Sequence, residues 1–138
     1  MKSILVVSSE TETYPLIAST YKSVFTVDKT ANKTAALELL RKKRCDLIFI
    51  DLDVLNNQDA GESYKESLKP FWQLYPSVEI IVMARQDKIR KAVDAVKAGA
   101  DDYLTYPLDA EELKLVSENL KKTRIMQSEI DYLRDQFW

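Results

Sequence analysis

The fold is decided by the stretch Asp46-Leu47-Ile48-Phe49-Ile50-Asp51-Leu52-Asp53, in which four apolar residues run directly into a carboxylate. A short apolar run of this kind is typical of a strand that is buried on both faces of a parallel sheet. Open parallel sheets bind their ligands at the carboxyl ends of the strands. The run therefore predicts a buried strand over residues 47–50 and places Asp51 at the end of the sheet where a ligand would bind.

Strands and helices alternate on both sides of this run. Apolar runs predict the strands, and apolar residues at helical spacing predict the helices. The strands are expected over residues 4–7, 24–27, 47–50, 78–83 and 103–105. The helices are expected over residues 11–22, 32–44, 62–74 and 86–98 and from residue 109 onward, with a polar loop over 56–61.

Local signals mark several helix ends. Asn32 and Asp109 are residue types that cap helix N-termini, and Gly99 provides the glycine that commonly follows a helix. Pro70 is expected to break or kink the helix over residues 62–74.

Five strands separated by helices of about a dozen residues predict right-handed βαβ units. The fold class is therefore α/β: a five-stranded, doubly wound parallel sheet of the flavodoxin-like order 2-1-3-4-5, with an extended C-terminal helix. In that fold, four loops meet at the carboxyl ends of the strands, namely residues 8–10, 51–53, 83–85 and 105–107.

The composition excludes several classes of function. The 138 residues suit one domain, and the net charge of −2 gives no electrostatic reason to expect nucleic acid as the main partner. The absence of histidine excludes histidine-based catalysis, histidine metal ligands and autophosphorylation on histidine. We expect Cys45 to be a reduced, buried thiol. With no signal peptide and no apolar stretch of ~20 residues, the chain is expected to be cytoplasmic and not bound to a membrane.

Over about residues 2–120, the chain resembles the receiver domain of bacterial two-component response regulators. The resemblance rests on the strand that ends in Asp51 and on the run Ala98-Gly99-Ala100-Asp101-Asp102-Tyr103-Leu104-Thr105-Tyr106-Pro107-Leu108. This run is similar to the receiver pattern of glycine-alanine, an acidic residue, an aromatic residue and lysine-proline. The resemblance implies a phosphorelay protein rather than an enzyme, with Asp51 as the phosphoacceptor and a histidine kinase as a partner. We therefore expect a receiver-like domain over residues 1–120 and a helical extension over residues 121–138.

In this family, four helpers support phosphoryl transfer to the aspartate. An acidic pair after the first strand and the backbone carbonyl two residues past the acceptor hold Mg²⁺. A Ser or Thr after the fourth strand and a lysine before the fifth-strand proline contact the phosphate. These groups are needed because the transferring phosphoryl group spreads negative charge over three oxygens.

The sequence keeps the acceptor but departs from the family pattern at three of these helpers. The acidic pair falls on Ser8 and Ser9, and the lysine position falls on Tyr106. The hydroxyl position falls on Ala84, or on Met83 if the alignment slips by one residue.

We therefore expect impaired or absent phosphorylation of Asp51, because each lost contact typically costs about 10²–10³ in rate. Glu10 adjoins the serine pair, and Asp53 stands at the carbonyl-donating position. With Asp51 these two carboxylates would form at most a weak Mg²⁺ site, and no cofactor is required. A working Mg²⁺-dependent phosphoacceptor on Asp51 remains the alternative.

The same positions suggest a change in packing. In the family, an aromatic residue on the fifth strand, here Tyr103, moves inward when the Ser or Thr moves toward the phosphate. Ala84 leaves room for an aromatic ring, and Met83 could pack its thioether on one. We hypothesise that Tyr106 fills the pocket with its hydroxyl near Asp51, and that Tyr106 and Ala84 hold one constitutive state. The alternative is that these residues only pack the structure and carry no signal.

The helical pattern that begins at Asp109 continues to Trp138, which is about 30 residues or about 45 Å. A heptad grid puts Val116, Thr123, Ile130 and Phe137 at one position and Asn119, Met126 and Leu133 at the other. This pattern predicts a homodimer through the helix, or through the face of the fourth and fifth strands. The alternative is a single helix that packs on its own domain.

Residues 128–137 resemble the linker of bacterial enhancer-binding transcription activators. This resemblance implies an ATPase domain and a DNA-binding domain downstream, so nucleic acid would be bound only through such an output domain.

One enzyme interpretation stays open. The motif Asp51-Leu52-Asp53-Val54 resembles the nucleophile motif of haloacid-dehalogenase-type phosphatases, in which the first aspartate attacks phosphorus and the second is the acid/base. In that family the motif belongs on the first strand, whereas here it is expected after the third.

Overall fold

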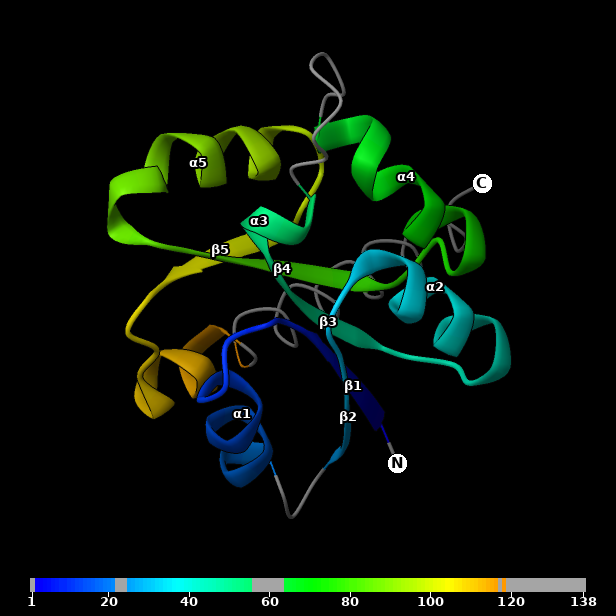
Figure 1. Ribbon diagram of the computed structural model, residues 1–138, viewed down its shortest axis with the longest axis horizontal. Coiled ribbons are helices and arrows are strands. Elements are labelled where there is room, and N and C mark those ends of the chain that lie inside the picture. Colours follow the sequence, from blue (N-terminus) through cyan, green and yellow to red (C-terminus); the bar gives the residue numbers. More distant parts are fainter. Residues whose placement is uncertain (1, 22–24, 56–63, 117, 119–138) are drawn as a thin grey trace, which may run out of the picture.

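Five parallel strands form a single sheet in the order β2-β1-β3-β4-β5 (Figure 1). The computed structural model describes residues 2–21, 25–55, 64–116 and 118. Within them the strands are β1 (Lys2–Val7), β2 (Phe25–Thr30), β3 (Leu47–Asp51), β4 (Glu79–Ala84) and β5 (Asp102–Thr105). This architecture confirms the α/β fold and the strand order that the sequence predicts.

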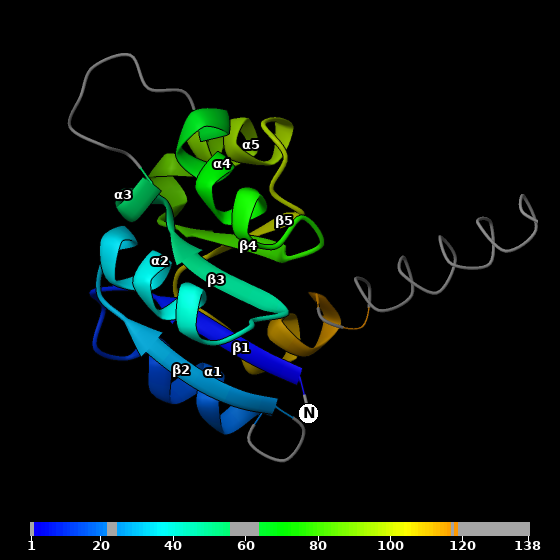
Figure 2. The same cartoon turned by 90° about the vertical axis from the view of Figure 1, so that its right-hand side faces the viewer.

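Helices cover both faces of the sheet (Figures 1 and 2). One face carries α2 (Lys33–Lys42), α3 (Leu52–Leu55), α4 (Tyr64–Leu74) and α5 (Ile89–Lys97), which follows the short 3₁₀ turn η1 (Gln86–Lys88). The other face carries α1 (Thr13–Tyr21) and the helical residues 110–116. None of the helices among these described residues is long and apolar enough to cross a membrane.

Two details differ from the sequence predictions, and two predictions are not tested. The residues directly after β3 form the short helix α3, which the sequence analysis did not predict. Pro70 lies inside α4 without ending it, because the buried Leu68 and Phe71 on either side hold the helix on the core. The predicted loop over residues 56–61 and the extension over 121–138 lie outside the described residues.

β3 lies at the centre of the sheet, and all five of its residues are buried. Ile48 and Ile50 belong to the core under α2, α4 and α5, whereas Leu47 and Phe49 belong to the core under α1. Fully burying a side chain of this kind stabilises the fold by roughly 1.5–3 kcal/mol. The strand that carries Asp51 is therefore anchored from both faces.

The predicted helix caps are present. The Asn32 side chain accepts a hydrogen bond from the Ala35 N–H at 2.8 Å, and the Asp109 side chain accepts one from the Glu111 N–H at 3.1 Å. Because each cap satisfies a helical N–H that has no partner within its own helix, these residues fix where the helices begin.

Gly99 ends α5 with a backbone φ of 129°. Its N–H donates to the Val96 carbonyl at 3.0 Å, and the next N–H donates to the Ala95 carbonyl at 3.1 Å, which is the Schellman arrangement. A Cβ atom at Gly99 would lie 2.5 Å from the Trp72 ring. Both the backbone angle and this close approach require glycine.

The thiol of Cys45 is buried and free of any disulfide, as the sequence predicts. It donates to the Leu47 carbonyl at 3.1 Å, and burial raises its pKa to about 11. A thiol held in this way is a structural residue rather than a reactive one.

We expect the Gly99→Ala substitution to destabilise the domain by about 1–3 kcal/mol, because it combines an unfavourable φ with a clash against Trp72. Urea unfolding measures the change, and Lys97→Ala, on the exposed side of the same helix, is the matched control. Equal stability of the two variants would contradict this account of the turn.

Candidate functional site

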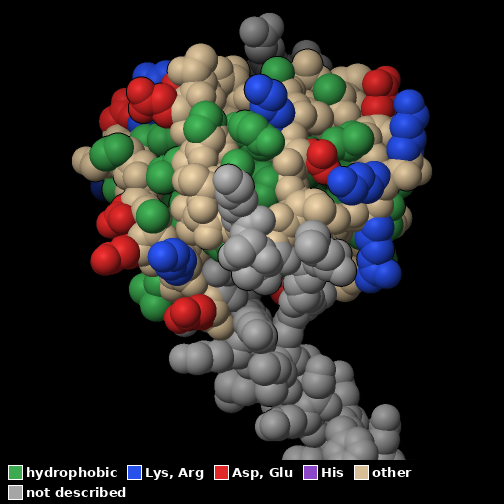
Figure 3. Space-filling view, turned by 90° about the horizontal axis from the view of Figure 1, so that it is seen from below, with side chains coloured by type: hydrophobic (Ala, Val, Ile, Leu, Met, Phe, Trp, Pro, Cys, Tyr) green, Lys and Arg blue, Asp and Glu red, His purple; other side chains and the backbone are tan. Residues whose placement is uncertain are grey.

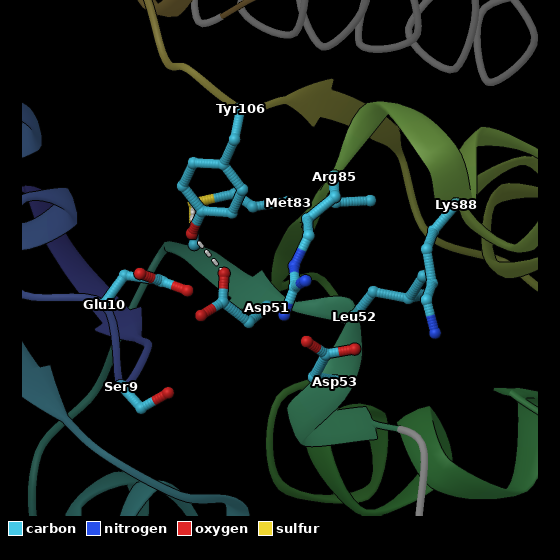
Figure 4. Close-up of a pocket in the computed structure, with 10 residues that line it drawn as sticks. Ser9, Glu10, Asp51, Leu52, Asp53, Met83, Arg85, Lys88 and Tyr106 are labelled. Atoms are coloured by element: carbon cyan, nitrogen blue, oxygen red, sulfur yellow. Dashed lines mark hydrogen bonds between the residues drawn. The ribbon is translucent and has the colours of Figure 1, made fainter.

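A pocket opens at the carboxyl ends of the strands, where the fold gathers the loops after β1, β3, β4 and β5 (Figure 4). Its lining is made by Ser9, Glu10, Asp51, Leu52, Asp53, Met83, Ala84, Arg85, Lys88 and Tyr106. Most of the candidate residues from the sequence therefore meet in one place. They do so because parallel strands end at the same edge of the sheet.

The Asp51 carboxylate lies at the bottom of this pocket and is only 5% exposed. One of its oxygens, Oδ2, accepts a hydrogen bond from the Ser8 hydroxyl at 2.5 Å. The other oxygen, Oδ1, accepts a hydrogen bond from the Tyr106 hydroxyl (Figure 4). Each oxygen of the candidate phosphoacceptor thus accepts one hydrogen bond from a hydroxyl group, one that follows β1 and one that follows β5.

The Tyr106 side chain is held from several directions. Its backbone N–H donates to the Ala84 carbonyl at 2.9 Å, and its hydroxyl lies 3.8 Å from the Met83 sulfur and 3.2 Å from the Thr13 hydroxyl. A phenol has one proton to donate, and here that proton goes to Asp51. Thr13 is therefore the donor in its contact with Tyr106, so the hydrogen bonds run from Thr13 through Tyr106 to Asp51.

Burial shifts the acidity of both partners. The pKa of Asp51 is raised, chiefly because burial disfavours the carboxylate, while the hydrogen bonds from Ser8 and Tyr106 oppose that shift. The negative charges of Glu10 and Asp53 add a smaller increase. The pKa of Tyr106 is raised well above its ordinary value, first by burial and then by the hydrogen bond to Asp51. Tyr106 therefore keeps its proton and remains a donor.

The remaining candidates are spread between the pocket and the core. Ser9, Glu10 and Asp53 are exposed, whereas Ala84 is buried at the end of β4. Tyr103 does not line this pocket. It packs against the core under α2, α4 and α5, whereas Tyr106 packs against the core under α1.

The site also contains residues that the sequence analysis missed. Thr13 is 2% exposed on the first turn of α1, and only its contact with Tyr106 reveals its part in the site. Arg85 and Lys88 line the pocket on the side of Asp53 (Figure 4). The sequence signal for this pair is that two basic residues follow the fourth strand closely, at the edge where the pocket forms.

The residues of this pocket do not match the Mg²⁺ site that the resemblance implies. Each oxygen of Asp51 accepts a hydrogen bond from a hydroxyl, and the positions of the acidic pair carry the neutral Ser8 and Ser9. Among the residues that the structure describes, no three Asp, Glu, Cys or His side chains form a group that could hold a metal ion. Glu10, Asp51 and Asp53 line one pocket without forming such a cage.

We expect Asp51→Asn to stabilise the protein at neutral pH by roughly 1–2 kcal/mol, because it removes a buried charge and keeps an acceptor for one hydroxyl. A raised folded-state pKa means that wild-type stability falls as pH rises from about 4 through that pKa. The difference between variant and wild type should therefore grow with pH across this window.

Urea unfolding between pH 3.5 and 8 tests this expectation, with the exposed Asp53→Asn as the control. A difference that is the same at every pH, or a less stable Asp51→Asn variant at pH 7, would contradict it.

The family model for the response regulator receiver domain matches residues 4–118 of this chain. The transcriptional regulatory protein ZraR of Klebsiella oxytoca is 38% identical over 100 residues, which cover 72% of this chain and 21% of ZraR. A putative response regulator of the NtrX-like type from Rickettsia conorii is 28% identical over 130 residues, which cover 93% of this chain and 27% of that protein. The chain thus spans about a fifth to a quarter of the length of these relatives.

Solved structures share the fold. NtrX from Brucella abortus superposes with a TM-score of 0.79 at 24% identity, covering 96% of this chain and 30% of that one. The receiver domain of the TMAO respiratory system response regulator TorR gives a TM-score of 0.71 at 25% identity, covering 89% of this chain and 98% of that one. Together with the placement of Asp51 and the family match over most of the sequence, these likenesses show that the chain belongs to the response regulator receiver domain family.

Proposed function

We propose that this receiver domain controls an attached transcriptional output domain from a pocket in which ordinary phosphorylation of Asp51 is impaired. The observation that carries the proposal is that both oxygens of Asp51 accept hydroxyl protons, from Ser8 and from Tyr106. The transcriptional output is suggested by relatives such as ZraR, which carry the name of transcriptional regulators and extend well beyond the receiver domain.

The chemistry of phosphoryl transfer supports impairment. One oxygen of the acceptor carboxylate must approach phosphorus, and the negative charge on the transferring phosphoryl group needs cations around it. Here Tyr106 places a phenol on Asp51 where the family has an ammonium group, and Ala84 offers no hydroxyl. Each such loss typically costs about 10²–10³ in rate.

The contacts of Tyr106 also support a single pocket state. Its hydroxyl donates to Asp51 on β3, accepts from Thr13 on α1, and lies 3.8 Å from the sulfur of Met83 on β4. The ring packs against the core under α1, so a large inward or outward movement would break contacts with three elements. The domain would then act as a constitutive regulatory module.

Homodimerisation is part of the proposal, through the C-terminal helix or through the face of β4 and β5. Val116, the first position of the predicted heptad seam, is 7% exposed and packs in the core of its own domain. A seam between two copies would therefore not include Val116. Leu115 is 57% exposed on the same helix and is available to a partner.

A second candidate function is a working phosphoacceptor that receives its phosphoryl group from a histidine kinase. It is favoured by Arg85 and Lys88, which bring positive charge to the same pocket. The phosphatase interpretation has no such support. Its motif begins at Asp51, the last residue of β3, and continues into α3, whereas that family carries it on the first strand. β3 is the third strand along the chain, and the chain belongs to the receiver family.

We expect the wild-type chain to form no alkali-labile adduct on Asp51 when incubated with acetyl phosphate and Mg²⁺. A variant that restores the family's groups, Ser8→Asp/Ser9→Asp/Ala84→Thr/Tyr106→Lys, should be labelled at least about 10²-fold faster, because it regains the missing charges and hydroxyl.

Intact mass spectrometry measures both rates, and adding Asp51→Asn to the restored variant is the control for labelling elsewhere. Wild-type labelling at the rate of the restored variant would overturn the proposed impairment and favour the second candidate function.

A further inference from the structure

We propose that α1 is a relay that couples the hydrogen bonds of the Asp51 pocket to the stability of the helix over residues 110–116, through one hydrogen bond at each end of α1. The proposal rests on the proposed function only in taking residues 110–116 as the path toward an output domain. Thr13 is a positioning residue at the pocket end, and Tyr21 makes the contact at the far end.

The first contact joins the pocket to the start of α1. Thr13 is the first residue of α1, is 2% exposed, and lies with its hydroxyl 3.2 Å from the Tyr106 hydroxyl. Because the Tyr106 proton goes to Asp51, Thr13 donates to Tyr106. A movement of the Tyr106 hydroxyl away from Asp51 must break this bond or move α1 with it.

The second contact joins the end of α1 to the C-terminal helix. Tyr21 is the last residue of α1, is 5% exposed, and donates its hydroxyl to the Leu113 carbonyl at 2.5 Å. Its ring is held by an edge contact with Phe25 at 5.3 Å between centroids and a tilted contact with Phe49 at 6.1 Å. Leu113 itself is fully buried, so this bond fixes the position of a core helix.

α1 can carry a displacement because it is one short helix packed into one core. Thr13 and Tyr21 are eight residues apart, or about 12 Å along the helix axis. Ile17 lies between them, is fully buried, and belongs to the same core as Met83 of the pocket and Leu113 of the C-terminal helix. A close-packed core transmits small shifts rather than absorbing them.

α1 and residues 110–116 pack on the same face of the sheet. Figure 3 shows the molecule from that side, with apolar and charged side chains interspersed over the visible surface. Tyr103 packs in the other core, on the side of α2, α4 and α5. The contacts of the Tyr106 hydroxyl therefore lead to α1 and not to the layer of Tyr103.

Amide hydrogen exchange of residues 110–116 in the full 138-residue chain tests the relay. Thr13→Val keeps the shape of the side chain and removes the donor, so exchange in residues 110–116 should rise about fivefold, the factor that corresponds to one buried hydrogen bond of about 1 kcal/mol. Tyr21→Phe should produce a similar rise. In the double variant, exchange in residues 110–116 should rise by less than the product of the two single-variant factors, because both substitutions act on one path.

Tyr14→Phe is the matched control, because Tyr14 lies on the same helix but donates to the Val27 carbonyl on β2. Amide exchange in residues 110–116 of the Tyr14→Phe variant should match that of the wild type. Exchange of the β1 and β3 amides serves as the reference for global unfolding.

The relay is wrong if Thr13→Val leaves exchange in residues 110–116 unchanged while Tyr21→Phe raises it, because the Tyr21 contact is then local. It is equally wrong if Thr13→Val raises exchange by the same factor in β1 and β3. No phosphodonor is present in this experiment. Labelling of wild-type Asp51 at the rate of the restored variant in the acetyl phosphate assay would therefore overturn the proposed function and leave this result standing.

Discussion

The structure of the pocket depends on one constraint, which is that a buried carboxylate needs a hydrogen-bond donor for each of its oxygens. Asp51 is buried because β3 is the central strand and carries apolar side chains to both cores. In a receiver domain that accepts phosphate, cations can meet this need. Here the hydroxyls of Ser8 and Tyr106 meet it, and both are neutral groups.

This substitution of hydroxyls for charges has a consequence for the rest of the domain. A lysine at position 106 would bring a mobile cation, whereas Tyr106 brings a ring that packs on the core under α1 and a hydroxyl that Thr13 supports. The pocket is thereby joined by direct contacts to a helix that also holds Leu113. The tyrosine that replaces the family's lysine therefore also links the pocket to the core under α1.

The general fold was readable from the sequence because its signals are local and agree with one another. The apolar run before Asp51 favours a buried strand, and Gly99 favours a helix end. In both places the local preference agrees with the final fold. Most of the residues that line the pocket could also be predicted, because parallel strands end at one edge of the sheet. The contacts of Ser8 and Thr13 could not be foreseen, since they depend on side-chain rotamers and on which donor reaches which oxygen. The expectation that Pro70 would end its helix was wrong, because core packing holds α4 together on both sides of the proline.

In the proposed pocket, the hydroxyls of Ser8 and Tyr106, rather than a metal ion and a phosphoryl group, bind the Asp51 carboxylate. This arrangement can be tested by a crystal structure of the chain grown with Mg²⁺ and beryllium fluoride, which mimics the phosphoryl group. We expect Ser8 and Tyr106 to remain hydrogen-bonded to Asp51, with no beryllium fluoride attached to its carboxylate. Beryllium fluoride bound to Asp51 beside a Mg²⁺ ion, with Tyr106 turned away, would contradict it.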